Sequence, residues 1–482
     1  MHSMIATSTS TASADGPTAR RKPRIGLLGV MQSLYDDMLP GITDRQAAYA
    51  RAVAESLRDV AEVELTPPVK TREDAERALR ELRGRGVEGV LVVMLTYGPA
   101  MHIARALAGA EVPVCVANTQ PVPEVTAGWD TADLTYNQGV HGAQDTANAL
   151  VRSGRSFEVV TGDWRSDGFR QAVAGWARAA AAVTRWRSLR VAVFGPPMNA
   201  MGDIRVDEHA LLRTLGPQVD ALGTGALHRA AASVPDSDVR ALMNAEDDRF
   251  DVDPRLSDTE RTEHGRMQLG IEQLLRERGY GAYSAHFGAI AEDGRFARLP
   301  LAAASSLMAQ GFGYAAEGDA ITAALMAAAR TLLGDTQFTE MYAMDFRRDA
   351  ILMSHMGEGN WALARDDEPV RLIKRPLGIG GLDDPPTFVF RYRPGPATLA
   401  ALAALEGDRF RLVVSEGQIL DTDELPALEE PYGFFRPDSG VRDCMDAWLR
   451  LGGPHHQVLN AGRNARAWQA FCTAAGIEMA TA

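Results

Sequence analysis

The order of apolar and helical segments changes once along the chain, near residue 330, and this change restricts the possible folds. Before it, short apolar runs alternate with stretches of helical periodicity. In the stretch 71–86, for example, Ala75, Leu79 and Leu82 fall on one helical face. Such alternation predicts parallel sheets with helices on both faces. The predicted strands are 24–30, 87–95, 112–118, 156–162 and 189–195.

After residue 331 the apolar runs follow one another with few helical segments between them. This pattern predicts an antiparallel, barrel-like β-domain whose strands include 336–346, 350–356, 386–395 and 409–417. We therefore expect an α/β protein with two parallel-sheet α/β domains followed by a C-terminal antiparallel β-barrel-like domain. The expected domains are residues 24–187, 188–330 and 331–482. Alanine-rich runs at 177–182, 321–329 and 399–404 are predicted to be tightly packed helices.

Composition and charge restrict the partners and the compartment. The 482 residues carry a formal net charge of −13, which argues against nucleic acid and against an anionic membrane surface. The longest apolar run, 90–95, is far shorter than the roughly 20 residues of a membrane-spanning helix. Cys115, Cys444 and Cys472 lack the spacing of a metal site and indicate reduced thiols in a cytoplasmic protein. Residues 1–23 have no signal-peptide apolar segment and predict a disordered tail.

Ligand-binding loops are expected at the carboxyl ends of the predicted parallel strands. These ends are rich in glycine, proline, amides and aromatic residues, which suit a sugar or another small polar ligand, although ordinary turns have the same composition. Neither GxGxxG nor GxxxxGK[ST] follows any predicted strand, so we expect no nucleotide cofactor.

An acidic residue interrupts an apolar pattern in the predicted β-domain. Alternate positions of one run are Phe338, Glu340, Tyr342, Met344 and Phe346, which predicts that Glu340 lies on an apolar strand face. Burying a lone ionised carboxylate costs several kcal/mol. The carboxyl is therefore either neutral or next to a cation, and the cation is either a metal ion or an arginine. Arg347 and Arg348 follow in the sequence and provide the second alternative.

Other residues are able to share a metal ion with Glu340. Glu317 stands where a glycine-containing turn meets a helix, and His355 alternates with Ile351 and Met353 in the next run. His455 and His456 follow a Gly-Gly-Pro turn, and we expect at most one of them to bind the same ion, because neighbours on an extended chain point to opposite faces. Two carboxylates and two imidazoles favour Mn²⁺, Co²⁺ or Fe²⁺, permit Zn²⁺ and suit Ca²⁺ poorly. Two open positions would then accept two oxygens of a sugar.

Several motifs carry a resemblance to a known family. They are GFGYAAEGDAITAAL (311–325), FTEMYAMDF (338–346), SHM (354–356), LGIGGLDDP (377–385) and GGPHH (452–456), with shorter matches at 32–35, 96–100, 137–142 and 159–164. In these motifs and in their order the chain resembles the L-arabinose isomerases, within the wider arabinose/fucose isomerase group. The resemblance implies two α/β domains, a C-terminal β-barrel-like domain, and aldose–ketose isomerisation of a small-molecule sugar through a cis-enediol.

The resemblance also implies roles for individual residues. The divalent-metal ligands would be Glu317, Glu340, His355 and His456, and the two glutamates would be the catalytic acid and base. His455 would contact substrate. The remaining implied substrate contacts are Gln32, Leu34, Tyr97, Met198 and Ile379, with Gln138 and His141 supplied by a neighbouring subunit. The resemblance therefore implies a trimer-based homo-oligomer, such as a hexamer, with its active site at a subunit interface.

Three positions depart from the family's pattern. Asn199 stands where arabinose-specific enzymes have an arginine, Asp163 stands where a histidine is usual, and Tyr97 replaces a phenylalanine. The metal ligands thus match while the substrate pocket differs, which leaves the sugar open. A metal-dependent sugar epimerase or lyase is the first alternative, and a non-catalytic sugar-binding protein is the second. Asp319 is expected to stabilise the start of a helix rather than to serve the site.

Overall fold

The computed structural model describes residues 21–482, and its N-terminal part is a five-stranded parallel sheet in the order β2-β1-β3-β4-β5. Residues 1–20 of the predicted tail lie outside the described residues. The strands are β1 (Arg24–Val30), β2 (Glu62–Leu65), β3 (Gly89–Met94), β4 (Val114–Asn118) and β5 (Glu158–Thr161). The helices are α1 (Tyr35–Met38), α2 (Ile42–Ser56), α3 (Arg72–Gly84), α4 (Ala100–Ala108), α5 (Thr131–Asn137), α6 (Gly139–Arg152) and α7 (Asp167–Arg187).

The local sequence explains where helix α3 begins and which face it buries. Thr71 and Asp74 form a capping box, in which each side chain accepts a hydrogen bond from the other residue's backbone N–H. Ala75, Ala78 and Leu82 then lie on the buried face, in agreement with the helical spacing in the sequence.

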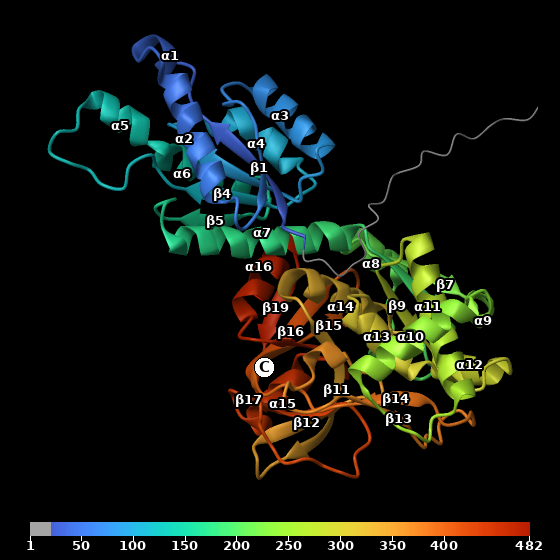
Figure 1. Ribbon diagram of the computed structural model, residues 1–482. Coiled ribbons are helices and arrows are strands. Elements are labelled where there is room, and N and C mark those ends of the chain that lie inside the picture. Colours follow the sequence, from blue (N-terminus) through green and yellow to red (C-terminus); the bar gives the residue numbers. More distant parts are fainter. Residues whose placement is uncertain (1–20) are drawn as a thin grey trace, which may run out of the picture.

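A second parallel sheet follows, in the order β10-β9-β6-β7. Its strands are β6 (Arg190–Phe194), β7 (Gln218–Leu222), β9 (Ala282–Ala285) and β10 (Gly313–Ala316). Its helices are α8 (Glu208–Thr214), α9 (Thr224–Ala232), α10 (Asp236–Arg249), α11 (Asp258–Arg278), α12 (Phe287–Asp293), α13 (Leu301–Ala309) and α14 (Ala320–Leu333). The long helix α7 separates the first sheet from the rest of the chain and packs on α14 (Figure 1).

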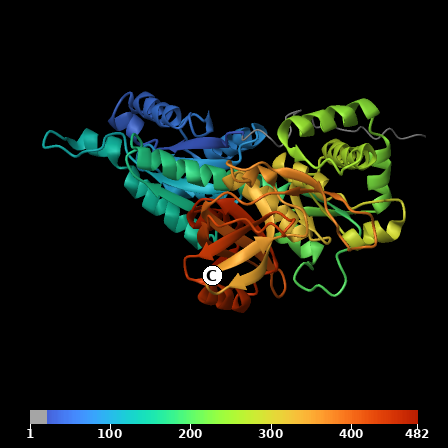
Figure 2. The ribbon, with the colours of Figure 1, turned by 60° about the horizontal axis from the view of Figure 1, so that its bottom comes forward.

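The C-terminal part is a closed antiparallel barrel. Its strands β15 (Gly395–Ala404), β18 (His456–Ala461), β11 (Thr336–Asp345), β12 (Ala350–Ser354), β17 (Tyr432–Pro437) and β16 (Phe410–Ile419) pair in that order, and β15 pairs with β16 to close the ring. Strand β19 (Glu478–Thr481) adds to β16, and helices α15 (Val441–Arg450) and α16 (Ala465–Ala475) complete the part. The predicted fold class is therefore confirmed. Figure 2 shows the barrel between the N-terminal sheet and the central helices.

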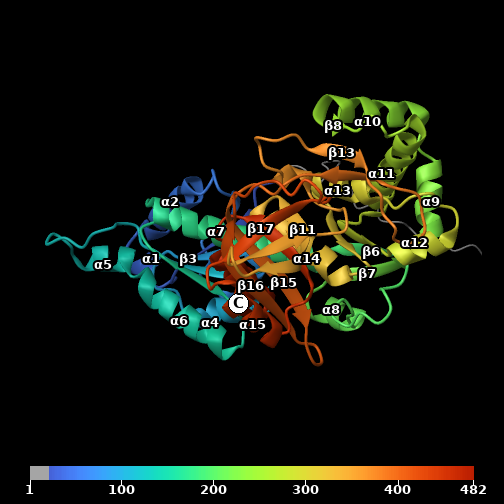
Figure 3. The same ribbon diagram turned by 90° about the horizontal axis from the view of Figure 1, so that it is seen from below.

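A small sheet connects the central helices to the barrel part of the chain. It pairs β14 (Pro386–Val389) with β13 (Arg371–Lys374), and β13 with the short β8 (Asp251–Val252) that follows α10. Figure 3 shows β13 and β8 beside α10, at one side of the grouped barrel strands. A 3₁₀ turn occupies Trp361–Leu363. Within residues 21–482, no helix has both the length and the apolar character that crossing a membrane requires.

Two expectations about the barrel are wrong. The alanine-rich run 399–404 is not a helix but part of β15, because pairing with both β16 and β18 outweighs the helix propensity of alanine. The face predicted from Phe338 to Phe346 is apolar and buried only at Phe338. Tyr342, Met344 and Phe346 are exposed, since β11 pairs with β18 only as far as Glu340 and both faces of the strand are exposed at 342–344.

Candidate metal centre

Four chain segments that are distant in sequence meet at one end of the barrel. Glu317 follows the last residue of β10 and precedes α14, while Glu340 lies on β11. His355 comes directly after β12, and His456 is the first residue of β18, where it stands opposite Glu340 in the strand pairing. The structure therefore brings together all four residues that were predicted as ligands. We call these four residues the metal group.

The distances around the metal group define two overlapping sets of potential ligands that share His456, namely Glu317 with His455 and His456, and Glu340 with His355 and His456. His456 Nε2 lies 3.2 Å from Glu340 Oε1 and 3.6 Å from Glu317 Oε2, and His355 Nε2 lies 3.8 Å from Glu340 Oε1. Ligand atoms of Glu340, His355 and His456 all lie within 4.8 Å of one another. Carboxylate oxygens and imidazole nitrogens in this number suit a transition-metal ion.

Polar atoms without partners point to the same conclusion. Within the part of the chain that the structure describes, Glu317 Oε2, His455 Nε2 and His456 Nε2 are buried and have no hydrogen-bond partner. Buried polar atoms are almost always paired in folded proteins. Here the three atoms face one another, so a cation at Glu317 Oε2 and His456 Nε2, with a polar ligand atom at His455 Nε2, would satisfy all of them. The residues present thus fit a divalent metal ion.

Each imidazole of the metal group is oriented by a carboxylate on its far side. His456 Nδ1 lies 2.8 Å from Asp319 Oδ2, and His355 Nδ1 lies 2.7 Å from Glu358 Oε2. Both Nε2 atoms are thereby directed inward, which is typical of metal-binding histidines. Tyr314 donates a hydrogen bond of 2.7 Å to the other oxygen of Glu358.

Asp319 serves two roles, of which the sequence indicated one. Its Oδ1 accepts a 2.9 Å hydrogen bond from the backbone N–H of Thr322 and so caps α14, as expected. Its Oδ2 orients His456, which no sequence pattern indicated. Glu358 was not predicted either, although its position three residues after His355 was the available signal.

Glu340 pairs with histidines rather than with an arginine. Arg348 pairs instead with Asp345, which removes the alternative considered from the sequence. Burial acts to raise the pKa of Glu340, but His456, whose Nε2 lies 3.2 Å from the carboxylate, and the charges of the other nearby histidines outweigh it and hold the pKa below its ordinary value. Burial acts to lower the pKa of His456, and Asp319 and Glu340 together raise it to about 10. The carboxylates of this site thus attract positive charge.

A strained turn presents Glu317 to the centre. Its backbone is in the left-handed region with φ of 65°, which is unusual for a residue other than glycine. The next residue, Gly318, has φ of 83°, and a Cβ there would lie 2.5 Å from the Cα of Pro197. The loop after β6 therefore packs directly on this turn. Met198, a predicted substrate contact in that loop, donates its backbone N–H to the carbonyl oxygen of Glu317 at 2.8 Å.

Both histidines of the pair face the centre, so the premise that they point to opposite faces is wrong, whereas the expectation that at most one of them binds the ion stays a prediction. His455 Nε2 lies 3.5 Å from Glu317 Oε2 and 3.7 Å from Glu340 Oε1. The two imidazole rings are 4.1 Å apart. The reason is that β18 begins at His456, so His455 belongs to the preceding turn and not to the extended strand.

The other predicted substrate contacts lie elsewhere in the chain. Ile379 is in the loop between β13 and β14, partly buried against the central core. The remainder are in the N-terminal part, around the carboxyl ends of β1 and β3 and the start of α6: Gln32, Leu34, Tyr97, Gln138 and His141. Figure 1 shows α1 and α5 on the opposite side of α7 from β11 and β12. One copy of the chain therefore does not bring this N-terminal set to the metal group.

Contacts within the N-terminal set hold its members near one another. Gln138 donates a 2.8 Å hydrogen bond to the hydroxyl of Tyr35, next to Leu34. The backbone N–H of Gln32 donates to the hydroxyl of Thr96, next to Tyr97, at 3.2 Å. Residues from three loops thus form one cluster at the carboxyl edge of the first sheet.

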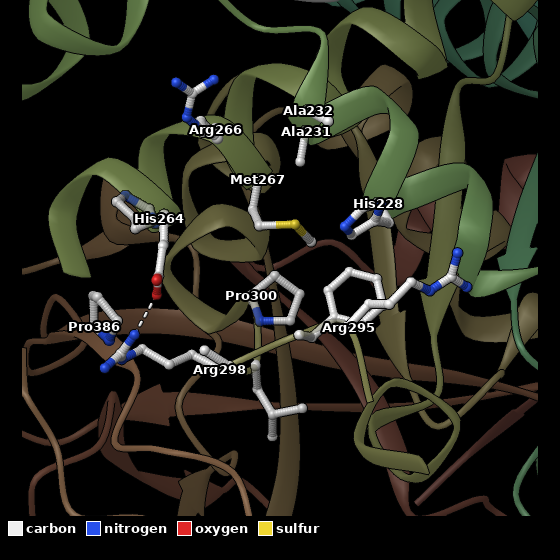
Figure 4. A pocket seen from close by; sticks show the side chains of 14 residues that line it. His228, Ala231, Ala232, His264, Arg266, Met267, Arg295, Arg298, Pro300 and Pro386 are labelled. Carbon is white, nitrogen blue, oxygen red and sulfur yellow. Dashed lines mark hydrogen bonds and ion pairs between the residues drawn. The ribbon is translucent and has the colours of Figure 1, made fainter. Parts of the chain in front are cut away.

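A separate cavity of about 240 Å³ lies among α9, α11 and the segment before α13 (Figure 4). Its wall is largely apolar, with Met267 and Pro300 beside His228, and Arg298 at its edge is paired with Glu263. It contains none of the residues that were predicted for the site.

Comparison with protein families accounts for nearly all of the described chain. The model of the L-arabinose isomerase N-terminal domain matches residues 22–188, that of the central domain matches 190–335, and that of the C-terminal domain matches 335–478. The chain belongs to the L-arabinose isomerase family. It is therefore an enzyme of the aldose–ketose isomerase class, an intramolecular oxidoreductase.

Curated members of the L-arabinose isomerase family are similar along most of the chain. The L-arabinose isomerase of Klebsiella pneumoniae (strain 342) is 31% identical over 412 residues, which cover 81% of this chain and 80% of that protein. The L-arabinose isomerase of Nocardioides sp. is 31% identical over 469 residues, or 93% of this chain and 91% of that protein. The Escherichia coli (strain K12) L-arabinose isomerase is 30% identical over 407 residues, with 81% and 80% covered.

Proposed function

We propose that this isomerase requires a divalent metal ion, with Mn²⁺ as the first candidate, and interconverts an aldose and its ketose through a cis-enediol. The observation that carries the proposal is the convergence of Glu317, Glu340, His355 and His456, with unpartnered buried atoms facing one another. When bound, the ion supplies polarisation of the sugar's C1 and C2 oxygens and stabilises the negative charge that develops on them.

The protein's own carboxylates move the proton. Glu317 and Glu340 approach the same imidazole nitrogen from two elements, so both face the carbons of a sugar held at that place. One glutamate removes the proton from C2, and the pair returns it at C1. Asp319 and Glu358 keep the imidazoles of His456 and His355 directed at the centre while this happens.

A second copy of the chain would complete the substrate pocket. Exposed apolar side chains surround the N-terminal set, namely Leu34, Met38, Leu134 and Val140, and others lie next to Glu340, namely Tyr342, Met344 and Phe346. Exposed apolar patches of this kind are typical of protein–protein interfaces. Since Gln32, Leu34 and Tyr97 cluster with Gln138 and His141, the proposal is that a neighbouring subunit supplies all five. The proposed assembly is therefore a homo-oligomer built from trimers, as the resemblance to the family implies.

The test is isomerisation by the purified protein loaded with Mn²⁺. Because its relatives are L-arabinose isomerases, L-arabinose is the first sugar in a panel of pentoses, hexoses and deoxy-sugars in deuterated water. NMR should detect a ketose and deuterium at C1 or C2. Absence of isomerisation of every sugar, with metal bound, would contradict the proposal. A carbon–carbon cleavage product or a second inverted stereocentre would favour a lyase or an epimerase instead.

A further inference from the structure

The loop between β6 and α8 reaches the metal group through Asp203. One oxygen of this carboxylate, Oδ2, accepts two hydrogen bonds from His455: 2.9 Å from the backbone N–H and 2.7 Å from Nδ1 of the ring. The two residues come from different parts of the molecule, since Asp203 belongs to the central part and His455 precedes a barrel strand. This pair is the closest polar link between that loop and the histidines of the site.

Two bonds to one oxygen fix both the main chain and the ring of His455. His455 lies before β18, so strand pairing does not hold it in place. With the hydrogen on Nδ1 directed at Asp203, a neutral imidazole has its lone pair on Nε2. That Nε2 faces the space between Glu317 Oε2, at 3.5 Å, and Glu340 Oε1, at 3.7 Å. The ring also packs on His456, but among the described residues its hydrogen-bond partner is Asp203, which therefore determines the tautomer.

The loop that carries Asp203 is itself braced. Arg205 Nη2 donates to the carbonyl oxygens of Pro197 and Met198 at 3.4 Å each, and to Oδ1 of Asn199 at 3.3 Å. Met198 is tied to the carbonyl of Glu317. Asp203 therefore has a defined position relative to the metal group. The bracing also includes Asn199, one of the positions where the sequence departs from the arabinose-specific pattern.

Exposure separates His455 from the deeper imidazoles. The side chains of His456 and His355 are 0% and 5% exposed, whereas that of His455 is 36% exposed. The two buried imidazoles of His355 and His456, together with Glu317 and Glu340, provide enough ligands for an ion. A ring at the mouth, facing the same space, meets whatever enters from solvent.

We propose that Asp203 is a positioning residue that holds His455 with Nε2 directed at the sugar, on the open side of the metal group. The proposal rests on the proposed function, because it assigns a role in sugar binding. It connects the loop whose sequence departs from the arabinose-specific pattern to a residue that touches substrate. Asp203 thereby belongs to the part of the site that determines how the sugar is held, and not to the part that holds the ion.

The experiment compares Asp203→Ala, Asp203→Asn and the control Glu208→Gln in the full-length protein. Glu208 is an exposed acid at the start of α8, so its replacement removes the same charge nearby without touching His455. Calorimetry measures the Kd of Mn²⁺ and, with Mn²⁺ bound, the Kd of the polyol L-arabitol, and the assay measures KM for L-arabinose. Loss of an outer contact of this kind typically costs about 10–100-fold.

We expect Asp203→Ala to weaken L-arabitol binding and raise KM by about that factor, with Mn²⁺ affinity unchanged. Asp203→Asn keeps an oxygen acceptor and should stay within about threefold of the unmodified protein. A double-mutant cycle with His455→Ala provides the decisive readout: the effect of Asp203→Ala should disappear when the imidazole is absent. If the alanine variant does not fold, Asp203→Ser replaces it in the cycle.

Several results would overturn the proposal. They are unchanged sugar and polyol binding in Asp203→Ala, equal losses in the asparagine and alanine variants, additive effects in the cycle, or a parallel loss of Mn²⁺ affinity. Failure of the proposed function is distinguishable, because a protein that binds Mn²⁺ and L-arabitol but isomerises no sugar would still give the Kd comparison. Unmodified protein that binds Mn²⁺ but neither sugar nor polyol would overturn both proposals.

Discussion

Two buried groups of acids and histidines in this molecule differ in how their charge is balanced. Between α10 and α11, His264 Nε2 lies 2.9 Å from Glu246 Oε1, and Arg261 Nη2 lies 3.6 Å from the other oxygen of Glu246. We call these three residues the helix-pair network. In the metal group, by contrast, two glutamates share histidines whose outer nitrogens are already engaged by further carboxylates.

The difference lies in whether the chain itself balances the charge. In the helix-pair network an arginine opposes the glutamate, and two neighbouring helices supply all three residues. In the metal group, acids outnumber fixed cations and four separate segments converge. Glu246 Oε2 and Arg261 Nε also lack a hydrogen-bond partner among the described residues, so a buried unpartnered atom is a weak sign of function by itself, whereas an excess of converging carboxylates over fixed cations is a stronger one.

The largest expected effect separates the two groups by activity. In the proposed function Glu340 binds the ion and transfers the proton, so Glu340→Gln should lower kcat by about 10³-fold or more for the sugar that the unmodified protein isomerises. Glu246→Gln, the matched change in the helix-pair network, should leave kcat within about twofold. Kinetics with saturating Mn²⁺ and circular dichroism check both. Similar losses of kcat in the two variants would contradict this difference between the two groups.

Stability should show the reverse order. Glu246→Gln removes the carboxylate partner of His264 and leaves Arg261 paired, among the described residues, with Asp247 alone, at 2.9 Å, which should lower the free energy of unfolding by about 2 kcal/mol. Urea denaturation of the metal-free protein measures this change. Glu340→Gln in the same experiment should cost less, because Glu340 is partly exposed and His456 keeps its pairing with Asp319. A stable Glu246→Gln protein would show that the helix-pair network does not contribute as argued.

Removal of the ion should affect only the metal group. Treatment with a chelator should abolish activity, and restoring Mn²⁺ at about 100 times its Kd should raise the free energy of unfolding by about 2.7 kcal/mol. The melting temperature with and without Mn²⁺ checks this. Glu246→Gln should keep the full Mn²⁺ response, and Glu340→Gln should lose most of it. An unchanged melting temperature in the unmodified protein would contradict a metal centre.

The smallest effect concerns acid stability near the helix-pair network. Burial acts to raise the pKa of Glu260, but hydrogen bonds from Lys374 and Ser257 lower it to about 2, from an ordinary value of 4.5. The folded pKa lies below the unfolded one, so this contribution is present above pH 4.5 and is lost as the pH falls toward 2. Glu260→Gln should therefore flatten the decline in stability between pH 5 and pH 3 by about 1 kcal/mol. Urea denaturation across that range measures it, and an unchanged slope would show that Glu260 is not responsible.

The sequence predicted the layers and the grouping of Glu317, Glu340, His355 and His456 better than it predicted the contacts between them. Glu340 was found because an acid in an apolar pattern requires a partner, even though Tyr342 and Met344 proved to be exposed. That His456 would stand opposite Glu340 depends on the pairing of two strands more than a hundred residues apart, and no local pattern contains this information.

The residues that orient the histidines were harder to predict from the sequence. Asp203 acts from a loop, and its partner is known only once the central part and the barrel are docked. The direction of the His455 side chain was predicted wrongly, because a rule for extended strands was applied to a residue in a turn. The run 399–404 shows the same limit, since pairing partners on both sides, and not alanine's own preference, made it a strand.

The left-handed backbone of Glu317 has a consequence for evolution in the laboratory. Only glycine adopts that conformation freely, and the strain of a larger residue is of order 1–3 kcal/mol. Selection of random variants for heat resistance alone would accordingly enrich Glu317→Gly, at the expense of a carboxylate that the proposed function requires. Screens for a more heat-stable variant of this enzyme must therefore also measure catalytic activity in every round of selection.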